Sequence, residues 1–280
     1  LGDALLNDGN GNQWALVNNV DFRMLGAIVN QDSTLTIQAA INSGKNIVDS
    51  PGVYLISKQA ELAGRGYCLI VPNGLNNNQG FGYWVRNRAG VNIHNVRSVN
   101  HTGWGFRVDT CTNVSMSDIG SNSTEDDVNN DGLHFIDCNN VVVDNVLIDV
   151  GGDDAFIIEA LFKDVFEITA TNINVRGSKQ RGVALFLDDS VAVDRRRFSN
   201  IKVQAVVANC DLAGVAVNGG DYENLSLDIQ SRNCFRGGEI LVGVAGFEGS
   251  LKNSDIKLRD FDCTQRSFRV FETNGTTRNN

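Results

Sequence analysis

NNDGLHFIDCNNVVVDNVLIDVGGDDAFIIEA, residues 129–160, contains one short pattern twice. Asp131-Gly132 precedes the strand-forming residues LHFI, and 23 residues later Asp154-Ala155 precedes FIIE. Between them the side chains alternate between apolar and polar, as in a half-buried strand, and a Gly-Gly turn follows. A chain that returns to the same acidic start at this interval has completed one structural unit and begun the next.

The same pattern continues along the chain in units of 22 to 33 residues. Segments of alternating polarity begin at Val91, Asn113, Asn140, Glu167, Asn200, Asn224 and Ser250. A near-constant period in this range indicates stacked units, and alternating polarity indicates that each unit is built of strands. Leucine-rich-repeat motifs are missing and the units are too short for propeller blades. The repeats therefore predict an all-β fold, a right-handed parallel β-helix.

The first 60 residues have a different pattern. The stretch DSTLTIQAAINSGK, residues 32–45, combines an N-cap at Asp32 or Ser33 with apolar residues at helical spacing and a stop at Gly44. The stretch NIVDSPGVYLI, residues 46–56, then predicts a strand, a Pro-Gly turn and a strand. We expect residues 1–60 to form an opening segment whose helix caps the solenoid. Residues 61–280 should form the β-helix and make one structural domain with that cap.

Charge and cysteine content argue against several functional classes. The chain has 24 basic and 33 acidic residues, a net charge of −9, which argues against a general nucleic-acid-binding protein. No run of 18 apolar residues is present, so we expect no transmembrane helix and no membrane partner. The six cysteines include no CxxC pair, so we expect no metal site and reduced, mostly buried thiols.

Glycine-led strands set the register between the predicted coils. WGFRVD, DGLHFI, DAFIIE, RGVALF and AGVAVN align without gaps, and their third column is apolar and must point inward. That column holds Phe106, Leu133, Phe156, Val183 and Val215. Equivalent positions on neighbouring coils lie about 4.8 Å apart. Asp131 and Asp154 should therefore be neighbours, with Asp153 beside them and Arg181 next along the stack.

Clustered carboxyl groups have the chemistry that glycoside hydrolysis needs. Carboxylates this close resist joint ionisation, so the pKa of one should rise while another stays ionised and activates water. We predict Asp131, Asp153 and Asp154 as catalytic residues. The residues predicted to bind substrate are His134, Arg181, Trp104, Arg107, Glu159 and Lys179. Aromatic faces beside acids suit sugar rings.

Each of these residues also has a purely structural interpretation. Asp residues at β-helix turns often bind backbone amides, and Arg181 would then neutralise the acids. His134 and Glu159 would be polar groups of the outer face, and Trp104 would be a packing residue.

Two stretches resemble known families. FRMLGAIVNQDSTLTIQAAINSGKNIVDSPGVYLI, residues 22–56, resembles the segment that opens the β-helix of bacteriophage tailspikes. NNDG followed by GGDDAFII resembles the paired acidic motifs of polygalacturonase-type glycoside hydrolases, which share the pectin-lyase-like fold. The resemblance implies an extracellular tail appendage of a virion, a homotrimer, that cleaves bacterial capsule or O-antigen polysaccharide without a cofactor. It also implies that this chain is a fragment or a minimal member.

The resemblance to polygalacturonases carries over to the three acids alone. Where that family has Gly-His-Gly, this chain has Gln180-Arg181-Gly182, and Ala216 and Asn218 stand where it has a basic pair. Two other functions therefore stay open. A polysaccharide lyase would use Ca²⁺ and a Lys or Arg as base, whereas a non-catalytic glycan-binding spike would use the acids only to form turns.

Overall fold

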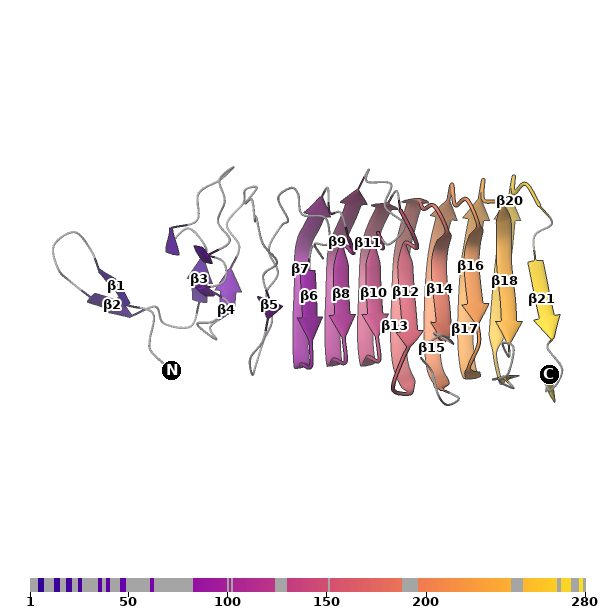
Figure 1. The fold of residues 1–280 in the computed structure, drawn as a ribbon, viewed down its shortest axis with the longest axis horizontal. Coiled ribbons are helices and arrows are strands. Elements are labelled where there is room, and N and C mark those ends of the chain that lie inside the picture. The colour runs from indigo at the N-terminus through magenta and orange to yellow at the C-terminus, as the bar shows by residue number, and fades with distance from the viewer. Residues whose placement is uncertain are drawn as a thin grey trace.

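The computed structural model describes residues 83–265 except 100, 102, 124–129, 151, 188–195 and 243–248. It also describes short stretches nearer the termini: residues 5–7, 13–15, 19–21, 25–26, 35–36, 39–40, 46–48, 61–62, 268–272 and 277–278. Within them, all strand pairing apart from one short hairpin is parallel, and successive strand pairs stack along the long axis of the molecule (Figure 1). The prediction of an all-β parallel solenoid is confirmed.

Two nine-stranded sheets form the solenoid, and the chain alternates between them. The first contains β5 (Glu61–Leu62), β6 (Tyr83–Arg86), β8 (Phe106–Asp109), β10 (Leu133–Ile136), β12 (Phe156–Ala160), β14 (Arg181–Leu187), β16 (Ala213–Asn218), β18 (Arg236–Val242) and β21 (Phe268–Glu272). The second contains β7 (Ala89–Val99), β9 (Thr112–Ser123), β11 (Asn139–Val150), β13 (Val165–Gly177), β15 (Arg197–Ala208), β17 (Asp221–Arg232), β19 (Ser250–Lys252), β20 (Asp255–Phe261) and β22 (Thr277–Arg278).

The described N-terminal residues form short strands and two short helical stretches. β1 (Leu5–Asn7) pairs antiparallel with β2 (Gln13–Ala15), and β3 (Asn19–Asp21) pairs parallel with β4 (Asn46–Val48). Within the predicted helix, residues 35–36 and 39–40 are helical, and Ala40 is buried. The rest of that helix and the Pro51-Gly52 turn lie outside the described residues. No helix in the described part of the chain is long and apolar enough to cross a membrane.

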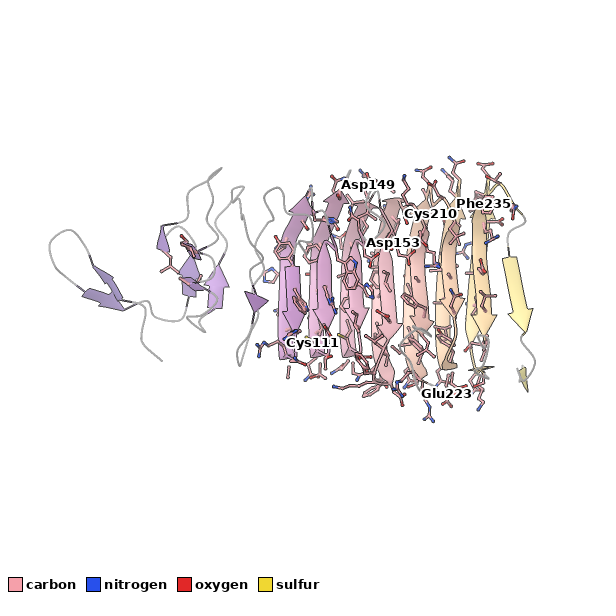
Figure 2. All side chains as sticks on the ribbon, viewed as in Figure 1. Cys111, Asp149, Asp153, Cys210, Glu223 and Phe235 are labelled. Atoms are coloured by element: carbon pink, nitrogen blue, oxygen red, sulfur yellow. The ribbon has the colours of Figure 1, made fainter. Side chains whose placement is uncertain are left out.

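The register predicted from the glycine-led strands is the register of the structure. Leu133 pairs with Phe106 on one side and with Phe156 on the other, and Val183 continues the row. All members of this apolar column are fully buried. The strands of the first sheet therefore point their third and fifth columns inward and present their fourth and sixth columns outward, whereas the first column lies at the turn before each strand. Figure 2 shows the described side chains on the stacked strands of the solenoid.

The second column of these strands, one residue after the first column, consists of small residues. It contains Gly105, Gly132, Ala155, Gly182, Gly214 and Gly237. A Cβ atom at Gly132 would collide with Ile148 and with the carbonyl oxygen of Ala155. A Cβ atom at Gly182 would collide with Val207 and the carbonyl oxygen of Gly214. At Gly132 and Gly182 the surrounding chain is so close that only glycine fits, whereas position 155 of the same column accommodates the methyl group of alanine.

The corners of the second sheet use left-handed backbone geometry. Asn113, Asn140, Asn200 and Asn224 all have φ near +55°, a conformation that asparagine tolerates better than most residues. Their amides bond from coil to coil: the Asn140 Nδ2 donates to Asn113 Oδ1 at 2.5 Å, and the Asn224 Nδ2 donates to Asn200 Oδ1 at 2.8 Å. We call these residues the asparagine ladder.

The described cysteines carry free thiols, as the sequence predicted. Cys111, Cys138, Cys210 and Cys234 are buried and Cys263 is partly buried, whereas Cys68 lies outside the described residues. The buried thiols donate to backbone carbonyls, for example Cys138 Sγ to Val108 at 3.3 Å. They behave as small core residues.

Candidate active site

Asp131 and Asp154 lie side by side on neighbouring coils, as the repeat predicted. Asp131 comes just before β10 and Asp154 just before β12, and these two strands pair in parallel. The Asp154 backbone N–H donates to Asp131 Oδ1 at 3.2 Å, and the Gly132 N–H donates to the Asp154 carbonyl at 3.0 Å. The acids are therefore fixed to the backbone of the stack and are not mobile surface groups.

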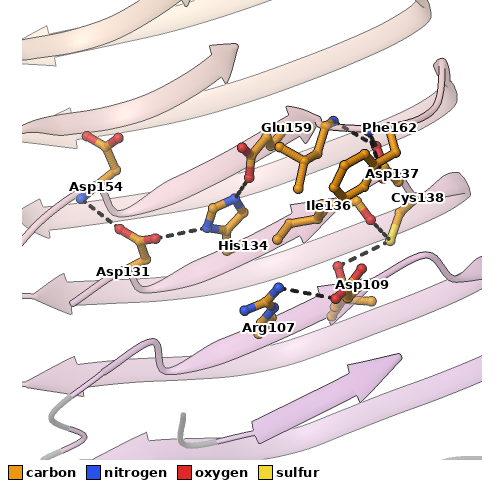
Figure 3. A network of polar contacts seen from close by, with 12 residues as sticks. Arg107, Asp109, Asp131, His134, Ile136, Asp137, Cys138, Asp154, Glu159 and Phe162 are labelled. Carbon is orange, nitrogen blue, oxygen red and sulfur yellow. Dashed lines mark hydrogen bonds and ion pairs between the residues drawn. The ribbon is translucent and has the colours of Figure 1, made fainter. Parts of the chain in front are cut away.

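His134 connects Asp131 to a further carboxylate (Figure 3). Its Nδ1 lies 2.9 Å from Asp131 Oδ2, and its Nε2 lies 2.8 Å from Glu159 Oε2. All three side chains are less than a tenth exposed. Burial lowers the pKa of His134, but the hydrogen bonds and charges of Asp131 and Glu159 outweigh it and raise the pKa to about 9. Both ring nitrogens are engaged with protein carboxylates, which leaves no ring N–H for a sugar.

Arg181 neutralises Asp154 from the next coil. The Arg181 N–H donates to Asp154 Oδ1 at 2.7 Å, and its Nη1 donates to Oδ2 at 2.8 Å. Burial raises the pKa of Asp154 and the Arg181 charge opposes that shift, so that the pKa lies at about 6. Asp154 is therefore a carboxylate at neutral pH, and Arg181 is bound to it.

Asp153 has a different environment from the other two acids. It is partly exposed, and among the described residues no hydrogen bond engages its carboxyl group. Burial, followed by repulsion from Asp131 and Asp154, raises its pKa to about 7, while Arg181 and His134 oppose the shift. Asp153 thus keeps its proton to higher pH than Asp154 does. The pKa values of both Asp153 and Asp154 are thus raised, where one was predicted, and burial contributes more to each shift than the repulsion between carboxylates from which the prediction was made.

One side of the site is aromatic and cationic. The Arg107 guanidinium lies 4.7 Å from the Trp104 ring centre and 5.0 Å from that of Trp84, and its Nη2 lies 3.2 Å from Asp109 Oδ2. The Trp104 ring also contacts the His134 ring, with centroids 4.3 Å apart. Trp104 therefore contacts both cationic groups on this side.

These residues surround a pocket of about 330 Å³ on the outer face of the first sheet. Its lining comprises Trp104, Arg107, Asp131, His134, Ile136, Asp153, Asp154, Ile157, Glu159, Leu161, Gln180, Arg181 and Phe186. Eight of the nine residues that the sequence singled out thus line one pocket. The ninth, Lys179, is exposed next to Gln180 and is not among the lining residues.

Two supporting groups were not predicted from the sequence. His101 Nε2 lies 3.0 Å from Ser121 Oγ, which donates to the Gly132 carbonyl at 3.1 Å, so a buried polar pair supports the backbone next to Asp131. The buried Asp137 carboxylate accepts the N–H groups of Leu161, Phe162 and Lys163 at 2.8 to 3.1 Å and so holds the turn beside the pocket. Asp137 has a φ of +52°, and the sequence pattern does not reveal this backbone conformation.

Comparisons with known proteins fit this geometry. Residues 73–182 match the model of the glycosyl hydrolases family 28. The matched stretch contains Asp131, Asp153, Asp154 and Arg181 and covers less than half of the chain. It agrees with the resemblance to pectin-lyase-like β-helices and supports an enzyme that acts on polysaccharides.

Two solved structures match this chain with low sequence identity and low TM-scores. The A-module of the mannuronan C-5 epimerase from Azotobacter vinelandii is 13% identical, with 93% of this chain and 100% of that chain covered and a TM-score of 0.42. The Agl-KA catalytic domain is 11% identical, with 92% of this chain and 69% of that chain covered and a TM-score of 0.37. A comparison with curated proteins finds no match.

Proposed function

We propose that this protein is a glycoside hydrolase that depolymerises a polysaccharide, with Asp153 as general acid and Asp131 and Asp154 as the ionised carboxylates. The observation that carries the proposal is that three carboxyl groups with different partners meet in one pocket: His134 is bound to Asp131, Arg181 to Asp154, and no described residue to the Asp153 carboxyl group. Asp153 has a pKa of about 7, Asp154 has a pKa of about 6 beside Arg181, and Asp131 accepts two hydrogen bonds. Division of labour between an acid and a carboxylate is what glycosidic cleavage requires.

The proposed reaction consumes one water molecule for each bond that is cut. Protonated Asp153 donates its proton to the glycosidic oxygen while the bond from that oxygen to the anomeric carbon breaks. A water molecule adds to the anomeric carbon, and one of the carboxylates Asp131 and Asp154 accepts its proton. The other carboxylate stabilises the positive charge that develops on the sugar ring. No cofactor is needed for these steps.

The substrate and context that we propose are those of a phage tailspike. The resemblance of residues 22–56 to tailspike opening segments supports an extracellular virion appendage, a homotrimer, that acts on bacterial capsule or O-antigen glycan. Arg107 and the tryptophans beside the pocket suit an extended sugar chain that crosses several coils.

The test is incubation with a panel of bacterial surface glycans, followed by mass analysis of released oligosaccharides. The hydrolase should give fragments that each gain one water, and the variant D131N/D154N should give none. Unsaturated, ultraviolet-absorbing fragments together with inhibition by EDTA would replace the proposal with a lyase. Unchanged release by the double variant would refute the active-site assignment, and binding of a glycan without any release would indicate a non-catalytic spike.

A further inference from the structure

His134 lies between two carboxylates that come from different coils. Asp131 precedes its own strand, β10, whereas Glu159 lies on β12, 25 residues further along the chain. The two contacts, at 2.9 and 2.8 Å, are as short as charge-assisted hydrogen bonds. The three side chains are less than a tenth exposed, so both contacts are largely shielded from water.

The number of donors and acceptors among Asp131, His134 and Glu159 determines where the protons lie. A neutral imidazole has one N–H and can donate to one acceptor only. Two ionised carboxylates at the two ring nitrogens need two donors, which only the imidazolium provides. The alternative is a neutral ring with a proton on Asp131 or Glu159, and that arrangement would remove a negative charge from the site.

The two arginines near His134 are each bound to another carboxylate. Arg107 on β8 is next to it in register, but its Nη2 is bound to Asp109. Asp153 and Asp154 lie in the turn before β12, and Arg181 at the start of β14 is bound to Asp154. From β14, Phe186 approaches with its ring centre 6.4 Å from that of His134. The acids on this face therefore share His134 as their buried cation.

We propose that His134 is a positioning residue of the site: as an imidazolium clamped between Asp131 and Glu159, it keeps Asp131 ionised and fixed in orientation. This role rests on the proposed hydrolase function, in which Asp131 must stay a carboxylate while Asp153 carries the proton. Glu159 is then the residue that keeps His134 charged, since it accepts the second ring N–H. Neither His134 nor Glu159 contacts the sugar in this role.

The protonation state can be measured without any substrate. In this 280-residue chain with isotope-labelled histidine, ring nitrogen shifts followed against pH report the charge of each of its three imidazoles. His94, an exposed residue of β7, provides the assignment control H94Q, which should leave the His134 signal unchanged. We expect His134 to remain an imidazolium through neutral pH. A ring that loses its proton at or below the ordinary histidine value of about 6.5 would overturn the proposal.

Glu159→Gln tests the second contact. The amide can neither keep a negative charge nor serve as an ionic acceptor, so His134 should lose its proton at lower pH than in the unsubstituted protein. An unchanged titration of His134 in E159Q would show that Glu159 does not hold the charge. Thermal unfolding of E159Q and of H134Q, beside H94Q, establishes that each variant is folded before its data are used.

Kinetics of His134→Gln separate positioning from a structural role. Glutamine can still donate to Asp131 but carries no charge, so kcat should fall roughly 10- to 100-fold with little change in KM. Both limbs of the pH–rate profile should move to higher pH, because the acids lose a neighbouring cation. A fall in kcat with unmoved limbs would contradict the charge role. If no glycan is cleaved by any form, the hydrolase proposal fails, whereas the titration still decides the state of His134.

Discussion

The asparagine ladder and the acid cluster are two uses of the same stacking geometry. In both, one polar position recurs on successive coils, so like side chains become neighbours at strand spacing. Along the ladder the side chains are exposed, neutral amides: Asn140 donates to Asn113 and Asn224 to Asn200. Asn200 itself donates to Glu167, which occupies the same column on the coil between Asn140 and Asn200. In the acid cluster the repeated side chains are carboxylates, which have no donors of their own and repel each other.

The two columns differ in where their side chains find hydrogen-bond donors. The ladder satisfies itself, and its members need only a tolerance for positive φ. The acids instead need outside donors, which His134, Arg181 and backbone N–H groups supply to Asp131 and Asp154. Asp153 receives none from the described residues and keeps a raised pKa. In the proposed mechanism, the stacking of like charges supplies the reactive carboxyl groups, and their uneven neutralisation determines which of them carries the proton.

Asp153→Asn should have the largest effect. It removes the proposed proton donor, so the rate should fall roughly 100- to 10,000-fold while the fold persists. The matched control is Asp118→Asn on β9, where an exposed carboxylate with φ of +56° accepts from Asn145 and an amide fits equally well. The D118N rate should equal that of the unsubstituted enzyme. Full activity in D153N, measured as reducing ends released, would remove Asp153 from the mechanism.

Stability should fall as the pH rises from about 4 to 9. The folded pKa values of Asp153, Asp154 and His134 all exceed their unfolded values, so the folded state binds more protons in these windows. Asp153 contributes between 3.8 and about 7, and Asp154 contributes between 3.8 and about 6. The His134 contribution is complete below 6.5 and is lost as the pH passes about 9.

From this shift, His134 alone accounts for at most about 3 kcal/mol. Denaturant melts at a series of pH values measure the slope, and D153N should flatten only the acidic part. A stability that rises over this range would mean that the acids are better stabilised as carboxylates than the site geometry indicates.

Asn140→Ala tests the ladder rather than the acids. Alanine pays the penalty of a left-handed backbone and loses the bond to Asn113, so we expect a loss of about 2 kcal/mol in the free energy of unfolding. Asn140→Gly keeps the backbone geometry and should lose less. Glycan cleavage by both variants should be unchanged, since the ladder belongs to the second sheet. A large loss of activity would show that the two columns are coupled.

Arg181→Gln should have the smallest effect of the four, and a pH-dependent one. Arg181 opposes the rise in the pKa of Asp154, so its removal moves that pKa above about 6. The acidic limb of the rate profile should move to higher pH, with about a fivefold loss at pH 6 for a shift of one unit. A loss that is equal at every pH would mean that Arg181 contributes by contact with the sugar instead.

The coil register could be predicted from sequence because one alignment of glycine-led strands fixes every outer column. Asp131, Asp154 and Arg181 were therefore placed correctly before any coordinates. The hydrogen bond between His134 and Glu159 could not be predicted in this way, because it joins different columns of different coils and depends on side-chain rotamers. The contacts of Asp137 and of the His101–Ser121 pair were also not predicted. Both involve backbone groups, the Leu161 N–H and the Gly132 carbonyl, whose positions an alignment of strand columns does not give.

The column of small residues behind the acids has a consequence for selectivity. Gly132 and Gly182 are in such close contact with neighbouring coils that the corner has no room to expand or to close around a ligand. We therefore expect the backbone around Gly132 and Gly182 to keep one conformation, with and without a glycan. Any change of shape during cleavage must then occur in the sugar. Glycans that are too stiff to adapt to this rigid side of the pocket should not be cleaved.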